Sequence, residues 1–180
     1  MVLNIAYTLK GVLFVDIHSD KMLVLLAGIF VVHIATVIML FVSTIANVWV
    51  VSKNGTISAG LWSQCVNGNC DETLSYAGED AFKSVQAFMI LAIIFSVISL
   101  IVFIIQLFTM EKGNRFFLSG AIMLVCWLCN LIGVSIYTDK YDSKDTFVHF
   151  DHHGYSFILA WICFCFSFVI GVLYLVLRKK

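Results

Sequence analysis

Four long apolar runs divide the 180-residue chain, and none of them contains Asp, Glu, Lys or Arg. They cover about residues 22–46, 85–110, 116–138 and 154–177. At about 1.5 Å of rise per residue, helices of this length cross the ~30 Å hydrocarbon core of a bilayer. The pattern predicts an all-α membrane protein with four transmembrane helices. The very short link at 111–115 predicts that the second and third helices are antiparallel neighbours.

Composition supports the same class of protein. Hydrophobic residues make up 61% of the chain and charged residues only 12%, whereas soluble domains have about 25% charged residues. The formal net charge is zero, so charge gives no indication of nucleic-acid binding. The sequence has no nucleophile–base arrangement, no phosphate-binding glycine loop and no room for a separate soluble domain. We therefore assign no enzyme activity, no catalytic residue, no cofactor and no metal.

Basic residues predict the orientation of the chain in the membrane, because cytosolic segments carry an excess of Lys and Arg. One set of segments holds seven of them: Lys10, Lys21, Lys112, Arg115, Arg178, Lys179 and Lys180. The other set holds four: Lys53, Lys83, Lys140 and Lys144. Both termini are therefore expected in the cytosol, with residues 47–84 and 139–153 outside.

The first external loop is predicted to form a small antiparallel sheet. Asn67-Gly68 favours a type I′ hairpin turn, in which both central residues have positive φ. This turn would place Cys65 opposite Cys70, close enough for a cross-strand disulfide. A disulfide belongs in an oxidising compartment, in agreement with the external placement. Asn54-Gly55 is a second hairpin signal, following a β-branched and aromatic run at 48–52 and preceding a returning strand at 56–62.

The same loop carries a specific motif. Trp49, the tripeptide Gly60-Leu61-Trp62, Cys65 and Cys70 resemble the signature of the claudin-like tetraspan superfamily. Segments 84–91, 134–138 and 172–180 are similar to the epithelial membrane protein and peripheral myelin protein family. The resemblance covers about residues 22–180.

This resemblance implies a four-helix bundle capped by the sheet, with Trp49 and Trp62 anchored at the bilayer interface. It also implies a multi-pass plasma-membrane protein with roles in epithelial cell contact, proliferation, differentiation, survival and membrane blebbing. The partners that it implies are membrane lipids and other membrane proteins, such as integrins or purinergic receptor channels, and a homo-oligomer is possible. Nucleic acid is not expected as a partner.

Residues 1–21 lie outside the resemblance, which begins at Met22. Their apolar run at 11–15 is too short to cross a membrane, and Asp16 follows it directly. We interpret them as an N-terminal cytosolic extension of the 22–180 domain, either a disordered tail or a short interfacial helix.

Three polar features are candidates for modification or chemistry. Asn54-Gly55-Thr56 is an N-glycosylation sequon on the predicted external side. The resembling family carries its sequon immediately before the first loop cysteine, where this chain has Gln64. His33 lies in the middle of the first span, where an ionisable group is a functional candidate. We favour a neutral imidazole that is hydrogen-bonded to a neighbouring helix, near Asn130.

Two other clusters are interpreted as structural. Cys126 and Cys129 form a C-x-x-C motif, but a redox role needs a thiolate with access to water, which the middle of a span does not provide. A second cluster lies in the second external loop: His149, Asp151, His152 and His153. It could bind zinc weakly or sense acidic pH, but we interpret these residues as solvated in a loop with no strong secondary-structure signal.

Two further functions remain open. A claudin-type junction strand would need polymerisation and a long first loop, and the loop here is short. The C-terminal Arg178, Lys179 and Lys180 also lack the hydrophobic end that claudins offer to PDZ scaffolds. An auxiliary subunit of an ion channel is the other alternative, because channel γ-subunits share the Gly-Leu-Trp pattern.

Overall fold

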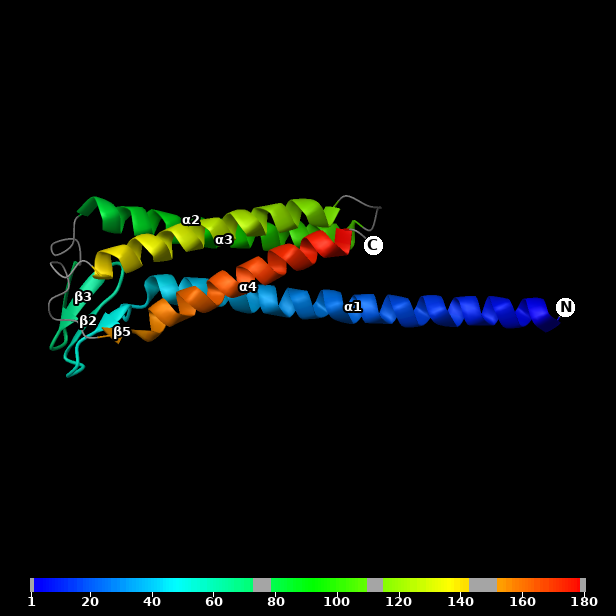
Figure 1. Cartoon of the computed structure of the whole chain (residues 1–180), viewed down its shortest axis with the longest axis horizontal. Coiled ribbons are helices and arrows are strands. Elements are labelled where there is room, and N and C mark those ends of the chain that lie inside the picture. The colour runs from blue at the N-terminus through cyan, green and yellow to red at the C-terminus, as the bar shows by residue number, and fades with distance from the viewer. Residues whose placement is uncertain (1, 73–78, 110–114, 143–151, 179–180) are drawn as a thin grey trace.

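A computed structural model describes residues 2–72, 79–109, 115–142 and 152–178. The elements are α1 (Val2–Ile45), β1 (Val50–Val51), β2 (Ile57–Ala59), β3 (Ser63–Val66), β4 (Asn69–Glu72), α2 (Glu79–Phe108), α3 (Arg115–Asp142), β5 (His152–His153) and α4 (Tyr155–Arg178). The four helices run side by side, with the sheet at one end of the bundle and both termini at the other (Figure 1).

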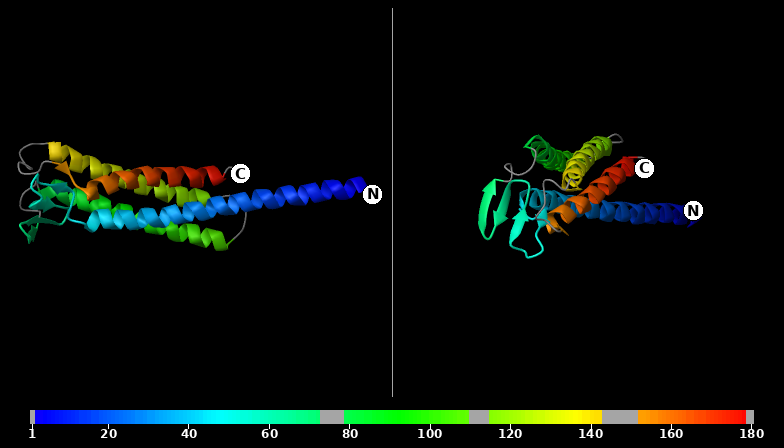
Figure 2. Two further views of the ribbon diagram at one scale, coloured as in Figure 1. Left: turned by 90° about the horizontal axis from the view of Figure 1, so that it is seen from below. Right: turned by 60° about the vertical axis from the view of Figure 1, so that its left-hand side comes forward.

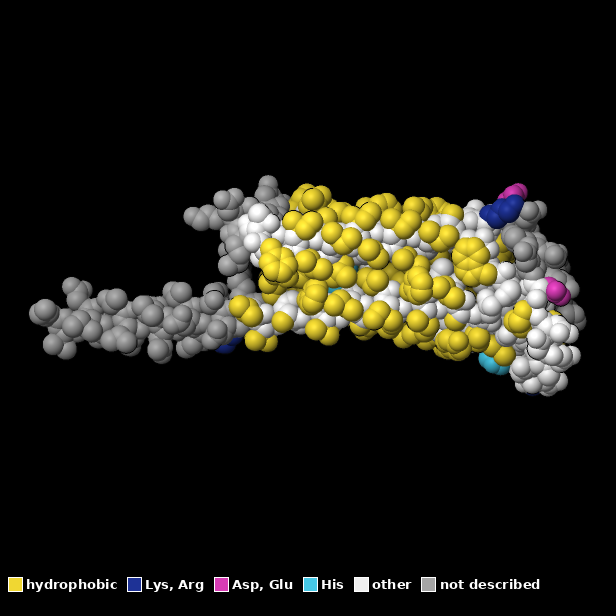
Figure 3. Space-filling view, turned by 180° about the vertical axis from the view of Figure 1, so that it is seen from behind, with side chains coloured by type: hydrophobic (Ala, Val, Ile, Leu, Met, Phe, Trp, Pro, Cys, Tyr) yellow, Lys and Arg dark blue, Asp and Glu magenta, His cyan; other side chains and the backbone are white. Residues whose placement is uncertain are grey.

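Four helices are long and apolar enough to cross a membrane: Leu23–Ile45, Asp80–Phe108, Phe116–Lys140 and Tyr155–Leu177. They confirm the predicted four-span bundle. Apolar side chains cover the face of the bundle shown in Figure 3, as lipid contact requires. The second and third helices pack against each other as the short link predicts, α3 packs on α4, and α1 packs on both α4 and α2.

The first helix differs from the expectation for residues 1–21. α1 is continuous over 44 residues, so this segment is neither a disordered tail nor a separate short helix. No proline interrupts the chain, and Asp20 and Lys21 are compatible with a helix interior. The α-helical hydrogen bonding therefore continues from the span into the preceding residues. This part of α1 projects beyond the bundle at the end opposite the sheet (Figure 2).

The sheet has five strands in the order β4-β3-β2-β1-β5, and every pairing is antiparallel. The β3–β4 hairpin has the predicted register, with Val66 opposite Asn69 and Cys65 opposite Cys70. Asn67 and Gly68 both have positive φ, 52° and 89°, which is the requirement of a type I′ turn. At the other predicted hairpin, the Gly55 N–H donates to the Ser52 carbonyl at 2.8 Å.

The second loop, 139–153, has no strong secondary-structure signal in its sequence, but the structure has regular elements at both of its ends. α3 extends to Asp142, beyond the predicted end at residue 138. β5 pairs with β1, placing Val50 opposite His153 and Val51 opposite His152. A strand of two residues depends on a partner about 100 residues earlier in the chain, so local sequence carries almost no signal for it.

Candidate functional site: the junction between sheet and bundle

Residues 46–49, here called the junction linker, connect α1 to β1 and join the sheet to the bundle. The last carbonyls of a helix lack intrahelical partners and need other donors. At the end of α1, three of these carbonyls accept hydrogen bonds from donors outside the helix's last turn or from its flanking residue. The backbone N–H of Ala46 donates to the Val42 carbonyl at 2.9 Å. The two tryptophans of the signature motif supply the next two hydrogen bonds.

The Trp49 indole donates its Nε1–H to the Ser43 carbonyl at 2.8 Å. The Trp62 indole donates to the Thr44 carbonyl, also at 2.8 Å. Two tryptophans separated by a β-hairpin therefore terminate the same helix by side-chain hydrogen bonds. This arrangement fixes the direction in which the sheet leaves α1.

Trp49 was expected to anchor the sheet at the bilayer interface, but its side chain contacts protein and is not open to lipid headgroups. Trp49 is completely buried within the protein. Its ring lies 4.6 Å from that of Tyr137 in α3 and 6.0 Å from that of Phe157 in α4. The aromatic cluster packs around the apolar ring, and the Ser43 carbonyl accepts the indole N–H. The protein therefore supplies both the apolar contact and the hydrogen bond that the bilayer interface would otherwise provide. Trp62 is 39% exposed, and its position is consistent with the expected anchor.

Gly60 and Leu61 have separate roles in the junction. A Cβ atom on Gly60 would overlap the backbone of Asn47 in the linker, so this position has room only for glycine. The Leu61 side chain is fully buried, and its carbonyl accepts a hydrogen bond from the Gln86 side chain of α2. The Gly-Leu-Trp tripeptide thus connects the sheet to α1 and α2 through three adjacent residues.

The linker also holds the start of α4, a contact that the sequence did not indicate. The Gly154 N–H donates to the Trp49 carbonyl at 2.7 Å, and the Ser156 N–H donates to the Val48 carbonyl at 3.2 Å. The Ser43 hydroxyl donates to the Ser156 carbonyl at 2.8 Å. The end of α1 and the beginning of α4 are consequently joined through one short segment.

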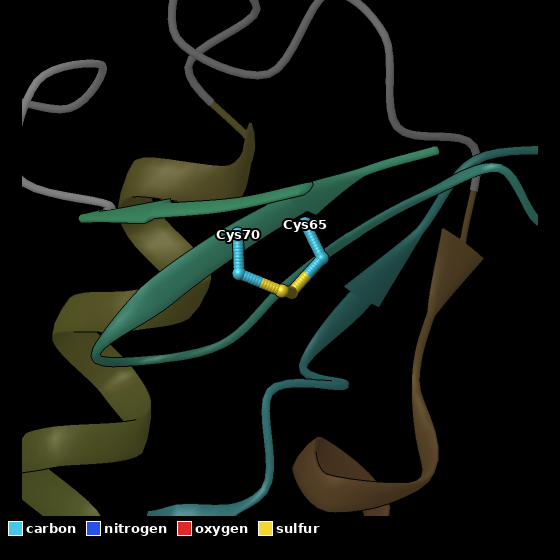
Figure 4. Close-up of a disulfide and its surroundings, with 2 residues drawn as sticks. All are labelled: Cys65 and Cys70. Atoms are coloured by element: carbon cyan, nitrogen blue, oxygen red, sulfur yellow. A yellow bond between two sulfur atoms is a disulfide. The ribbon is translucent and has the colours of Figure 1, made fainter. Parts of the chain in front are cut away.

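The far hairpin of the sheet lies away from these contacts and carries the disulfide. Cys65 and Cys70 are bonded across β3 and β4 with their Cα atoms 4.0 Å apart (Figure 4). Residues 66–71, which form the tip of this hairpin, are exposed. The disulfide and the pairing of β3 with β2 constrain this hairpin.

Removal of the disulfide is expected to destabilise the hairpin. Cys65→Ser, alone or combined with Cys70→Ser, should lower the free energy of unfolding by about 2 kcal/mol, because the closed ring is small. Misfolding of the loop should also retain more protein in the endoplasmic reticulum, as measured by surface biotinylation. Cys165→Ser is the matched control, since that thiol is free and exposed on α4. Normal surface delivery of the Cys65 variants would contradict this expectation.

The other predicted site residues are distributed over the molecule. Asn54 is exposed in the turn between β1 and β2. His153 stacks on Phe157 with ring centroids 4.2 Å apart, and burial lowers the pKa of its imidazole. His153 is thus held in the sheet rather than freely solvated, whereas His152 is exposed. His149 and Asp151 lie outside the described residues. Within the described ranges, no three His, Cys, Asp or Glu side chains form a group that could hold a metal ion.

His33 is buried and hydrogen-bonded to neighbouring helices, as expected, and its two partners are residues other than Asn130. Its Nε2 lies 3.2 Å from the Ser96 carbonyl in α2, and its Nδ1 lies 2.9 Å from the Tyr174 hydroxyl in α4. A carbonyl only accepts, so Nε2 carries the proton and Tyr174 donates to Nδ1. Asn130 donates instead to the Ala160 carbonyl. Cys126 and Cys129 are buried in the bundle.

This geometry defines a class: a multi-pass membrane protein with four helices and a small sheet docked on one end through two tryptophans. Residues 22–174 match the PMP-22/EMP/MP20/Claudin family, and the chain belongs to this family. It is 74% identical to human epithelial membrane protein 1 over 159 residues, which cover 88% of this chain and 100% of that protein. The mouse epithelial membrane protein 1 is 71% identical over 160 residues, with the same coverage. Bovine epithelial membrane protein 2 is 42% identical over 173 residues, covering 88% of this chain and 99% of its own length.

Proposed function

We propose that the protein is a non-enzymatic organiser of lateral and cell–cell contacts in the plasma membrane. The observation that carries this proposal is the exposed β3–β4 hairpin, which a disulfide holds rigid at the far side of a sheet docked on the bundle. A rigid surface loses little conformational entropy when it binds, so it is suited to recognition by another protein. Family membership supports the same type of function.

The proposed topology places the sheet outside the cell and both termini in the cytosol. The excess of basic residues on the terminal side and the disulfide on the opposite side support it independently. In this topology, residues 1–21 are a cytosolic extension of the 22–180 domain. The finer roles in proliferation, differentiation, survival and blebbing, and partners such as integrins or purinergic receptor channels, have the family resemblance as their support.

Protease protection tests the topology. An epitope tag placed after Lys180 is expected to resist external protease in intact cells and to be digested after permeabilisation. A tag inserted at Asn67-Gly68, in the exposed hairpin turn, is the matched control and should be digested in both conditions. Cleavage of the C-terminal tag in intact cells would overturn the proposed orientation.

Asn54 is proposed as a glycosylation site. Its exposure in a turn leaves space for a glycan, and the sequon Asn54-Gly55-Thr56 is intact. Asn54→Gln should increase mobility on a denaturing gel to the position reached after glycosidase treatment of the wild type. Thr56→Ala should produce the same shift while retaining Asn54. Unchanged mobility of both variants would show that the sequon is not used.

Crosslinking on intact epithelial cells, followed by purification and mass spectrometry, tests the function. The wild type is expected to recover membrane proteins, and Val66→Glu with Asp71→Lys at the hairpin tip should lose them. Cys165→Ser, at an exposed position of α4 outside the sheet, is the control. Recovery mainly of the protein itself across cell borders would support a claudin-type strand instead. Recovery of a single channel protein at a fixed stoichiometry would support the alternative of an auxiliary channel subunit.

A further inference from the structure

An apolar groove lies between α1 and α4, in the half of the bundle nearest the termini. Its volume is about 500 Å³, and it is lined by residues between Val24 and Val32 of α1 and between Phe166 and Leu173 of α4. This volume falls in the range of about 300–1,000 Å³ that is typical of small-molecule sites. We propose that this groove binds one acyl chain of an anionic phospholipid, whose headgroup pairs with Lys21.

The groove has a buried floor, exposed rims and an open middle that an acyl chain could fill. Ile29 and Ile170 form the floor and are 4% and 1% exposed. Val24 and Val169 form the rims and are 71% and 51% exposed. Gly28 opens the middle, since a Cβ atom there would meet no atom within 4 Å. The lining from Val24 to Val32 extends about 12 Å along the helix axis, close to the ~15 Å depth of one leaflet.

The lining favours a lipid chain over a second protein helix. Helices associate in membranes through small residues and interhelical hydrogen bonds, because lipid is as apolar as leucine. Every residue that lines the groove is apolar or glycine, and Gly28 is the single small residue among them. A helix seated here would gain no hydrogen bond, whereas a flexible acyl chain needs none.

Charge at the mouth of the groove selects the headgroup. Lys21 precedes Val24 by three residues, Leu25 by four and Gly28 by seven, so these positions share one face of α1. Lys21 is exposed. α4 ends at Arg178, so the same end of the bundle carries additional basic sequence. Basic residues beside a groove between transmembrane helices are suited to an anionic headgroup.

The test uses the full chain, purified in mild detergent from vesicles of phosphatidylcholine with a minor fraction of phosphatidylserine. Native mass spectrometry is expected to show one retained phosphatidylserine per protein. Gly28→Leu should abolish its retention by filling the groove. Ala27→Leu, the adjacent exposed position outside the lining, is the matched control and should retain the lipid. Lys21→Gln should reduce the preference for phosphatidylserine about fivefold, equivalent to about 1 kcal/mol for one basic residue.

Photocrosslinking provides a second readout that does not depend on the groove-filling variant. Phosphatidylserine with a photoactivatable acyl chain should label peptides that contain residues 24–32 and 166–173 in the wild type. Retention of the lipid by Gly28→Leu, or labelling confined to other helices, would overturn the proposal. Equal retention of both phospholipids irrespective of Lys21 would overturn the headgroup assignment. Displacement by cholesterol would assign the groove to a sterol, and loss of a dimer in Gly28→Leu without a change in lipid would assign it to a second copy.

Discussion

Replacing Trp49 with Ala is expected to destabilise the protein by about 3–5 kcal/mol, the range for loss of a large aromatic side chain from a core. The substitution removes ring contacts with Tyr137 and Phe157 and leaves the Ser43 carbonyl at the end of α1 without its indole donor. Because the junction linker holds both α1 and α4, the loss should affect the sheet and the bundle together. Reversible unfolding of the purified protein in mixed micelles would measure it.

Two further variants separate packing from hydrogen bonding at this position. Trp49→Phe retains much of the ring but removes the N–H, so it should cost less than the Ala variant while still losing about 1 kcal/mol for the hydrogen bond. Trp62→Ala removes a similar hydrogen bond from a ring that is 39% exposed, and its cost should be smaller than that of Trp49→Ala. Equal effects of Trp49→Ala and Trp62→Ala would show that burial in the aromatic cluster contributes little.

Local sequence could predict the spans and one hairpin because each depends on interactions between near neighbours. A long apolar run identifies a transmembrane helix without knowledge of its partners. Asn67 and Gly68 define a turn by their own backbone preferences, and the register of β3 and β4 follows from the turn, including the opposition of Cys65 and Cys70.

The features that the sequence did not predict in detail depend on residues far apart in the chain. From local sequence, Trp49 resembles an interfacial tryptophan. In the folded protein it is buried against Tyr137 of α3 and Phe157 of α4. The hydrogen-bond partners of His33 are Ser96 and Tyr174, which lie on two other helices. The periodicity of one helix does not indicate which residues of another helix it contacts. β5 exists through its pairing with β1. Each case requires the three-dimensional arrangement of the helices, and local pattern contains no information about it.

The junction explains why a glycine stands between β5 and α4. A Cβ atom on Gly154 would overlap the Val48 carbonyl well inside van der Waals contact, and its next neighbours are also atoms of Val48. The obstacle is backbone that is already engaged, because the Val48 carbonyl accepts the Ser156 N–H and the adjacent Trp49 carbonyl accepts the Gly154 N–H. Neither group can move without breaking the connection between α1 and α4.

Gly154→Ala is therefore expected to destabilise the protein by about 3 kcal/mol or more, at the upper end of the range for overpacking. Gly28→Ala is the matched control. It places the same methyl group in open space on α1 and should stabilise the helix by up to about 1 kcal/mol through propensity. Unfolding in mixed micelles should show opposite signs for the two variants. A neutral Gly154→Ala would mean that the start of α4 can shift away from the junction linker, and that the sheet and the bundle are not held together there.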